Sequence, residues 1–61
     1  MRFIVIAWSN GIPVGYAKTF DTLTKNSKYA KKCKTEYEAQ ELIDDLMVMY
    51  PSYIFTYETV V

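Results

Sequence analysis

The segment from Phe3 to Trp8 is apolar on both of its faces, and this feature constrains the fold more than any other. In an extended strand, successive side chains point to opposite sides. One face carries Phe3, Val5 and Ala7, and the other carries Ile4, Ile6 and Trp8. A strand that is apolar on both sides is normally central in its sheet and covered on both sides. The rest of the chain must therefore supply neighbouring strands and a cover for each face.

A tight hairpin is expected directly after this strand. Asn10-Gly11 is a strong hairpin signal because both residues tolerate positive φ. The turn leads into a second strand over residues 14–20, one face of which is small enough to lie under a helix. The polar stretch 21–34 is expected to form a connection.

One helix is expected after the connection. Thr35 and Glu38 form a capping box, and apolar residues then recur every three or four positions. Pro51 disfavours a helical conformation of the residue before it, so the helix should end near Met49. A third strand is expected over residues 52–61.

The order β-β-α-β predicts an α+β fold in a single domain covering residues 1–61. We expect a three-stranded antiparallel sheet in the order 2-1-3 with one helix on one face. A single helix covers only one face, so the other face must meet something else. For a chain of this size, apolar burial and the entropy cost of ordering roughly balance. A homodimer is therefore expected.

The expected dimer or partner interface is the sheet face opposite the helix. If Ile4, Ile6 and Leu46 belong to the helix-side core, five residues remain for the interface. They are Phe3, Val5, Tyr53, Phe55 and Tyr57. Strand registers are not fixed by the sequence, so the reverse assignment of faces stays open. Two copies packed sheet to sheet would cover the face, and pairing of edge strands into one continuous sheet is the alternative geometry.

Composition removes several classes of function. With no histidine and one cysteine, the chain has neither an internal disulfide nor the ligands of a structural zinc site, and no histidine-activated nucleophile. Glu41, Asp44 and Asp45 fit a solvated helix face better than a metal site. We therefore expect no catalytic residue, metal, cofactor or small-molecule substrate. The absence of a long apolar run and of signal-peptide features predicts a cytoplasmic protein without membrane contact.

Cys33 lies among three lysines, and two interpretations are open. If the thiol is exposed, Lys31, Lys32 and Lys34 should lower its pKa. The favoured interpretation is a buried thiol, because free cysteine is among the most buried residue types.

The neutral net charge conceals a strong separation of charge. Residues 1–34 carry seven basic groups and one acid, a net charge of +6, whereas residues 35–61 carry six acids and no base, a net charge of −6. Such a polarised domain can steer a partner toward itself. The lysines fit a solvated loop, and the alternative is contact to nucleic acid, with Tyr16, Tyr53, Phe55 and Tyr57 as a stacking surface. The lysines concerned are Lys25, Lys28, Lys31, Lys32 and Lys34.

Residues 30–39, Ala-Lys-Lys-Cys-Lys-Thr-Glu-Tyr-Glu-Ala, followed by Leu42-Ile43, resemble small phage and prophage proteins. Those proteins have an N-terminal hairpin and then Ala-Lys-x-Phe-x-Thr-x-x-Glu-Ala at the start of a helix. The matching residues are Ala30, Lys31, Thr35, Glu38 and Ala39, while Cys33 stands where phenylalanine is usual. The resemblance implies a phage-type binding protein, of the kind that takes over or disarms the host by binding a host protein.

These observations together predict a small non-enzymatic protein-binding module that acts as a homodimer. Its partners would be a second copy and a host protein in the host-cell cytosol. A small nucleic-acid-binding protein that uses the lysine-rich segment is the alternative.

Overall fold

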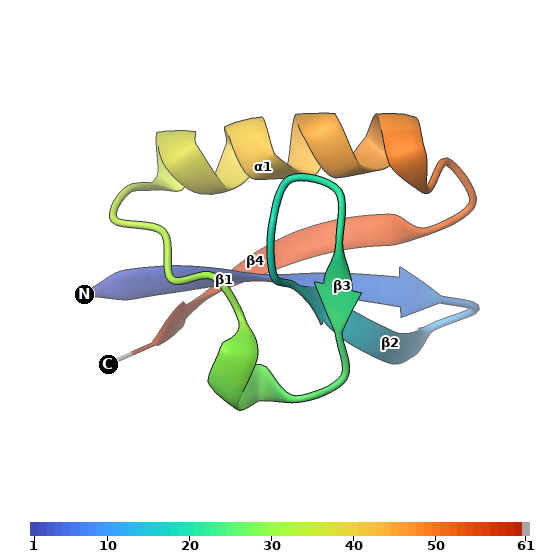
Figure 1. Ribbon diagram of the computed structural model, residues 1–61, viewed down its shortest axis with the longest axis horizontal. Helices are drawn as coiled ribbons and strands as arrows, with labels where there is room; N and C mark the ends of the chain where they lie inside the picture. The colour runs from blue at the N-terminus through green and yellow to red at the C-terminus, as the bar shows by residue number, and fades with distance from the viewer. Residues whose placement is uncertain (61) are drawn as a thin grey trace.

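The sheet is built around β1 (Arg2–Ser9), in a computed structural model that describes residues 1–60. All neighbouring strands are antiparallel, in the order β3-β2-β1-β4. The other elements are β2 (Ile12–Ala17), β3 (Leu23–Thr24), the 3₁₀ helix η1 (Ser27–Tyr29), α1 (Glu36–Met49) and β4 (Ile54–Val60). Helix α1 runs along one face of the sheet, and η1 lies on the other side (Figure 1). No helix within residues 1–60 is long and apolar enough to cross a membrane.

The α+β class, the single α-helix and the antiparallel sheet are confirmed, but the prediction of a three-stranded sheet is wrong. The sheet has four strands, because Leu23–Thr24 adds a short strand beside β2. Two residues within a polar stretch carry no periodic signal, so this strand could not be recognised. The predicted second strand also extended too far, because the chain turns after Ala17, where Lys18 donates its backbone N–H to the Thr22 carbonyl. Residue 61, the last of the predicted third strand, lies outside the described residues.

The hairpin between β1 and β2 forms at the predicted turn. Asn10 and Gly11 both adopt positive φ, at 53° and 76°. A tight two-residue hairpin turn of type I′ requires positive φ at both of its central residues. A bulge between Ala7 and Trp8 interrupts the register of the two strands and places Pro13 opposite Trp8. Such a bulge increases the local twist of the hairpin.

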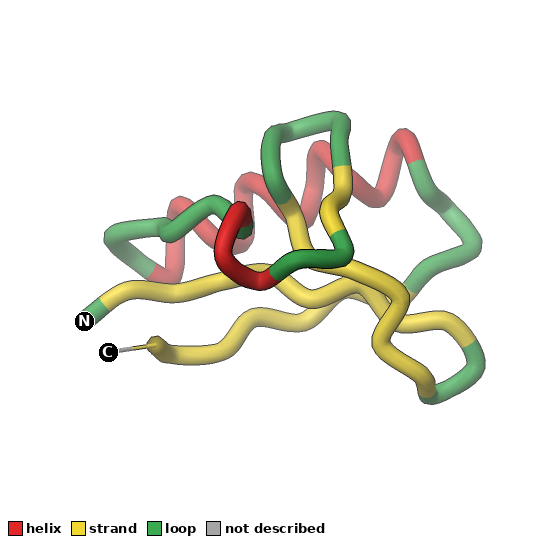
Figure 2. Tube along the Cα trace, turned by 60° about the horizontal axis from the view of Figure 1, so that its bottom comes forward, coloured by secondary structure: helices red, strands yellow, loops and turns green. Residues whose placement is uncertain are grey.

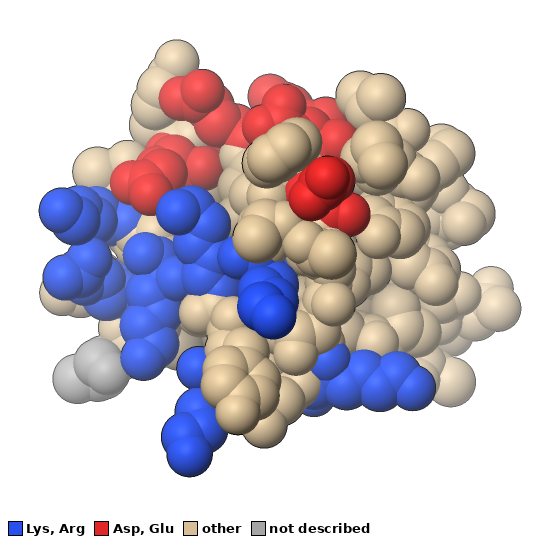
Figure 3. Space-filling view, viewed as in Figure 1, with Lys and Arg blue, Asp and Glu red and all other residues tan. Residues whose placement is uncertain are grey.

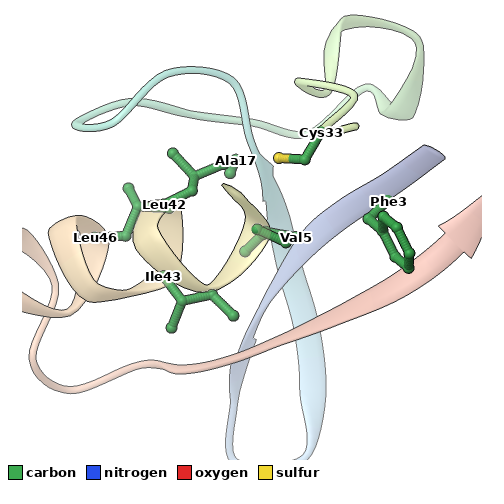
Figure 4. Close-up of a cluster of buried hydrophobic side chains, with 8 residues drawn as sticks. Phe3, Val5, Ala17, Cys33, Leu42, Ile43 and Leu46 are labelled. Atoms are coloured by element: carbon green, nitrogen blue, oxygen red, sulfur yellow. The ribbon is translucent and has the colours of Figure 1, made fainter. Parts of the chain in front are cut away.

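The predicted assignment of the two sheet faces is reversed. Phe3 and Val5 face α1, where they form a buried cluster with Leu42, Ile43 and Leu46 (Figure 4). Ala17, Cys33 and Ala39 complete this cluster, and Phe55 packs against it. Ile4 and Ile6 point to the opposite face and are also buried. No apolar face of β1 therefore stays open, which removes the reason for packing two copies sheet to sheet.

Helix α1 begins with the predicted cap. The Thr35 hydroxyl accepts a hydrogen bond from the Glu38 backbone N–H at 3.1 Å. The Glu38 carboxylate in turn accepts from the backbone N–H of Lys34 at 3.3 Å, one residue earlier than in a standard capping box. The first bond satisfies a backbone donor that the first turn of a helix leaves free, and the second satisfies the N–H of the residue before the cap.

We expect Thr35→Ala to lower the free energy of unfolding by about 1 kcal/mol, because the Glu38 N–H loses its acceptor. The measurement is urea unfolding followed by circular dichroism. Thr35→Ser, which keeps the hydroxyl, serves as the control and should unfold close to the wild-type midpoint. Equal stability of the alanine variant and the wild type would contradict the capping role.

Candidate protein-binding surface

Charged residues are absent from one end of the molecule. All seven bases and seven acids lie outside residues 3–17 and 46–57. The fold brings parts of these two stretches together, because the β1–β2 turn, the last turn of α1 and the start of β4 lie at the same end (Figure 1). We call residues 8–14 and 46–55 the uncharged end. In the space-filling view this end is mostly tan, with one blue side chain reaching along its lower border (Figure 3).

Large apolar side chains are exposed at the uncharged end. They come from three separate segments and are Ile12, Met47, Val48, Met49 and Ile54. Val48 is the most exposed of them, at 80% of its surface. A protein interface is depleted of charged residues at its core and enriched in aromatic residues and methionine. The uncharged end has this composition.

A surface cavity of about 610 Å³ borders the uncharged end. Its lining is Pro13, Val14, Gly15, Tyr16, Lys25 and Tyr53. Strand β3 pairs only with Tyr16 and Ala17, so the earlier lining residues of β2, 13–15, have no paired strand on that side. Gly15 allows a close approach of β3, since a β-carbon there would lie 3.1 Å from the Thr24 carbonyl oxygen, a tight contact.

The five predicted interface residues are divided by the structure. Val5 is fully buried and Phe3 nearly so, which takes both out of reach of a partner. Tyr53, Phe55 and Tyr57 are partly accessible, and the T-shaped contact between Tyr53 and Phe55 has a centroid distance of 6.5 Å. Tyr57 packs edge-on against Phe3 at 5.9 Å and keeps 37% of its surface exposed. The accessible members therefore lie along β4 and just before it.

The predicted lysines Lys25, Lys28, Lys31, Lys32 and Lys34 are all exposed. Most basic side chains gather toward the end opposite the uncharged one, and the acids of α1 lie above them (Figure 3), whereas Lys25 lines the cavity beside the uncharged end. A groove of about 330 Å³ separates the two signs, with Lys18 and Lys31 on one side and acids of α1 on the other. Lys31 and Glu38 approach to 4.0 Å across it.

The lysines and the predicted stacking surface are not brought together. Phe55 and Tyr57 stand on the α1 side of the sheet, since they are opposite Ala7 and Val5 of β1. Tyr16 points to the other face, because its partner on β1 is Ile6. The aromatic side chain in contact with a lysine is instead Tyr29, whose ring centroid lies 6.0 Å from the Lys18 ammonium. The sheet therefore offers no row of aromatic rings beside the lysines.

Cys33 is buried, as favoured from the sequence. Its backbone exchanges two hydrogen bonds with Phe3, one of 2.9 Å from the Phe3 N–H and one of 2.7 Å to the Phe3 carbonyl. Burial raises the pKa of the thiol, the Glu38 carboxylate raises it further, and the Lys31 ammonium lowers it in part. A buried thiol with a raised pKa is a poor nucleophile, so its role is in packing.

Two features of this surface were not recognised from the sequence. The first feature is the stretch without charged residues between Asp45 and Glu58, which is visible in the sequence. Whether it forms part of an uncharged surface depends on which other segments the fold places beside it. The second feature is the unpaired outer side of β4, which follows from the strand order and has no signal in the sequence.

Within residues 1–60, no three histidine, cysteine or acidic side chains converge as a metal site would require. Comparison of the chain with protein-family models, with curated proteins and with solved structures found no match.

Proposed function

We propose that this chain is a non-enzymatic protein-binding module that acts as a homodimer and holds a second protein at its uncharged end. The observation that carries the proposal is the concentration of exposed apolar side chains where no charge has to be desolvated. Burying a charge without a partner is expensive, whereas burying methionine, valine and isoleucine is favourable. The uncharged end can therefore lose its water at little cost when an apolar partner docks.

The resemblance of residues 30–39 to small phage proteins bears on the nature of the partner. It favours a host protein, bound in the host-cell cytosol during takeover or defence. Three of the matching residues, Thr35, Glu38 and Ala39, cap α1 or lie in its first turns, so the resemblance concerns the fold and assigns no contact residue.

A nucleic-acid-binding protein is the second candidate, and the exposed lysines favour it. Lys25, Lys28 and Lys32 are exposed at a basic surface, where phosphate groups could release counterions on binding. The acids of α1 border that surface, however, and the sheet aromatics do not accompany it.

Two matched double variants separate these candidates. Ile12→Lys with Val48→Lys places charges on exposed positions of the uncharged end, and Lys28→Glu with Lys32→Glu reverses charges on exposed positions at the other end. We expect the first variant to reduce capture of a discrete host protein by at least about tenfold, since each buried lysine lacks a partner charge, while the second leaves capture unchanged. The measurement is a quantitative pull-down with immobilised protein from host extract.

The same variants test the alternative in a mobility-shift assay across a salt series. Binding to DNA or RNA that weakens steeply with salt, is lost in the lysine variant and survives in the apolar variant would replace the proposal with the nucleic-acid function. A discrete protein band that only the apolar variant loses supports the proposal.

A further inference from the structure

Strand β4 is an edge strand whose outer side is unpaired. It has one neighbour, β1, and no other segment of residues 1–60 runs along its outer side (Figure 2). The reciprocal hydrogen bonds of Phe3 with Cys33 show that the backbone groups of Phe3 point away from β4. In an antiparallel pair the direction alternates from residue to residue, so Thr59, which is opposite Phe3, points outward. By the same alternation, the N–H and C=O groups of Phe55 and Tyr57 also point outward.

The two edges of the sheet differ in how well they are protected from pairing with another chain. At the edge formed by β3 and the unpaired part of β2, β3 has only two residues, and β2 carries Pro13 beside a bulge. Short strands, proline and bulges are devices that block the pairing of edges. At the other edge, β4 extends over seven residues with an unbroken register against β1 and without proline or lysine. An unprotected edge of this length is a surface suited to pairing.

We propose that β4 pairs with β4 of a second copy, antiparallel and around a two-fold axis at Tyr57, so that the two sheets become one of eight strands. The proposal rests on the homodimer part of the proposed function and names its interface. In this register Tyr57 is opposite itself and Phe55 is opposite Thr59 of the second copy. All three residues with outward backbone groups then exchange hydrogen bonds, and every residue from Ile54 to Val60 has a partner.

Charge and length select this register among the symmetric ones. An axis at Glu58 would place two carboxylates directly opposite each other, which is destabilising. An axis at Thr56 would move Thr59 beyond the end of the partner strand and leave its outward groups unpaired. An axis at Tyr57 places Glu58 opposite Thr56, with no like charges in contact. The strand is therefore complementary to itself, which is what a two-fold interface requires.

The side chains beside this edge also fit a second copy. Tyr57 lies on the α1 side, packs against Phe3 and is 37% exposed, so two tyrosine rings would meet next to the axis. Ile43 points from α1 toward β4 (Figure 4), and Met47, one helical turn later, lies on the same flank with more than half of its surface exposed. Pairing of the edges would bring these apolar groups of both copies toward the axis.

Thr59→Pro tests the edge without touching the core. Thr59 is exposed and its N–H points outward, so proline removes a hydrogen bond to a second copy but none to β1. The wild-type chain should sediment as a dimer at micromolar concentration, and the variant should dissociate about 30-fold more readily, as expected for two hydrogen bonds lost across the axis. Thr59→Val keeps the N–H and should remain as dimeric as the wild type. Circular dichroism of the variants shows whether each is folded.

A cysteine pair tests the register, and it also covers the case in which the proline variant does not fold. With the axis at Tyr57, Tyr57→Cys places two thiols on residues whose Cα atoms are about 5.5 Å apart, within the range of a disulfide. The same change at the next position, Glu58→Cys, leaves the two Cα atoms more than about 7 Å apart, which is too far to bridge. Mild oxidation should therefore cross-link only the Tyr57→Cys variant, since native Cys33 is buried.

The outcomes distinguish this interface from the proposed function as a whole. A wild-type dimer that Thr59→Pro leaves intact and Tyr57→Cys does not cross-link would overturn the β4 interface and keep the homodimer. Cross-linking of Glu58→Cys instead would overturn the register. A wild-type monomer at all concentrations would overturn both the interface and the homodimer, while capture of a host protein at the uncharged end is measured separately.

Discussion

Leu46→Ala is expected to lower the free energy of unfolding by about 3 kcal/mol. Leu46 is among the largest fully buried side chains and lies in the cluster that α1 forms with β1. Its truncation removes apolar contacts and leaves a cavity that the fold can fill only in part. For a domain of this size such a loss corresponds to a fall in Tm of about 15 °C and removes much of the total stability.

The control for this prediction is Val48→Ala, two positions along the same helix. Val48 is 80% exposed, so its truncation should change stability by no more than about 0.5 kcal/mol, with a small gain from helix propensity. Urea unfolding followed by Trp8 fluorescence and by circular dichroism gives both values. Equal effects of the two substitutions would contradict the packing of α1 on the sheet.

The thiol of Cys33 should react with an exposed-thiol reagent at least about 100-fold more slowly in the native protein than in urea. The side chain has no exposed surface, and its backbone is held by two hydrogen bonds to Phe3, so labelling requires local opening. Burial also raises the pKa of the thiol, which reduces the fraction of reactive thiolate at any given pH. Labelling followed by mass spectrometry measures both rates.

The same pKa shift predicts how stability depends on pH. The unfolded chain releases the Cys33 proton near the ordinary value of 9.0, whereas the folded chain holds it to higher pH. The stability associated with this group is therefore full below about pH 9 and decreases as the pH rises above it. Cys33→Ala should remove this part of the alkaline dependence. Native and unfolded labelling at equal rates would contradict the buried thiol.

The helix was predictable because its signals are local. Thr35 caps the helix through a bond to a residue three positions away, and Pro51 limits the residue just before it. The hairpin was predictable for the same reason, since Asn10-Gly11 sets its own turn geometry. The central place of β1 followed from its apolar character on both faces.

The same apolar character explains why the faces were assigned wrongly. Val5 and Ile6 are equally suited to a core, so the pattern of β1 is nearly symmetric and does not say which side meets the helix. Which face meets the helix is decided by contacts between residues far apart in the sequence. Val5 of β1 and the small Ala17 of β2 both lie in the cluster that packs against α1. Strand β3 was missed because its two residues owe their extended conformation to pairing with β2.

The candidate surface was only partly accessible to reasoning from the sequence. The two uncharged stretches can be seen in the printed chain, but their meeting at one end requires the hairpin and the register of β1 against β4. The open edge of β4 likewise follows from the strand order. A residue such as Thr59 has no unusual chemistry of its own, and its importance comes from the direction of its backbone N–H.

The pairing of the first strand with the last has a consequence for the rate of folding. Phe3 is opposite Thr59, so nearly the whole chain must be looped before this ladder can form. Closing such a loop loses chain entropy before any contact compensates for it, whereas the hairpin and the helix form from neighbours in sequence. Docking of β4 should therefore be the slow step. Until it occurs, the backbone groups of Ile4 and Ile6 on the β4 side of the central strand lack their partner, and an unfolded neighbour can take the place of β4 at high concentration.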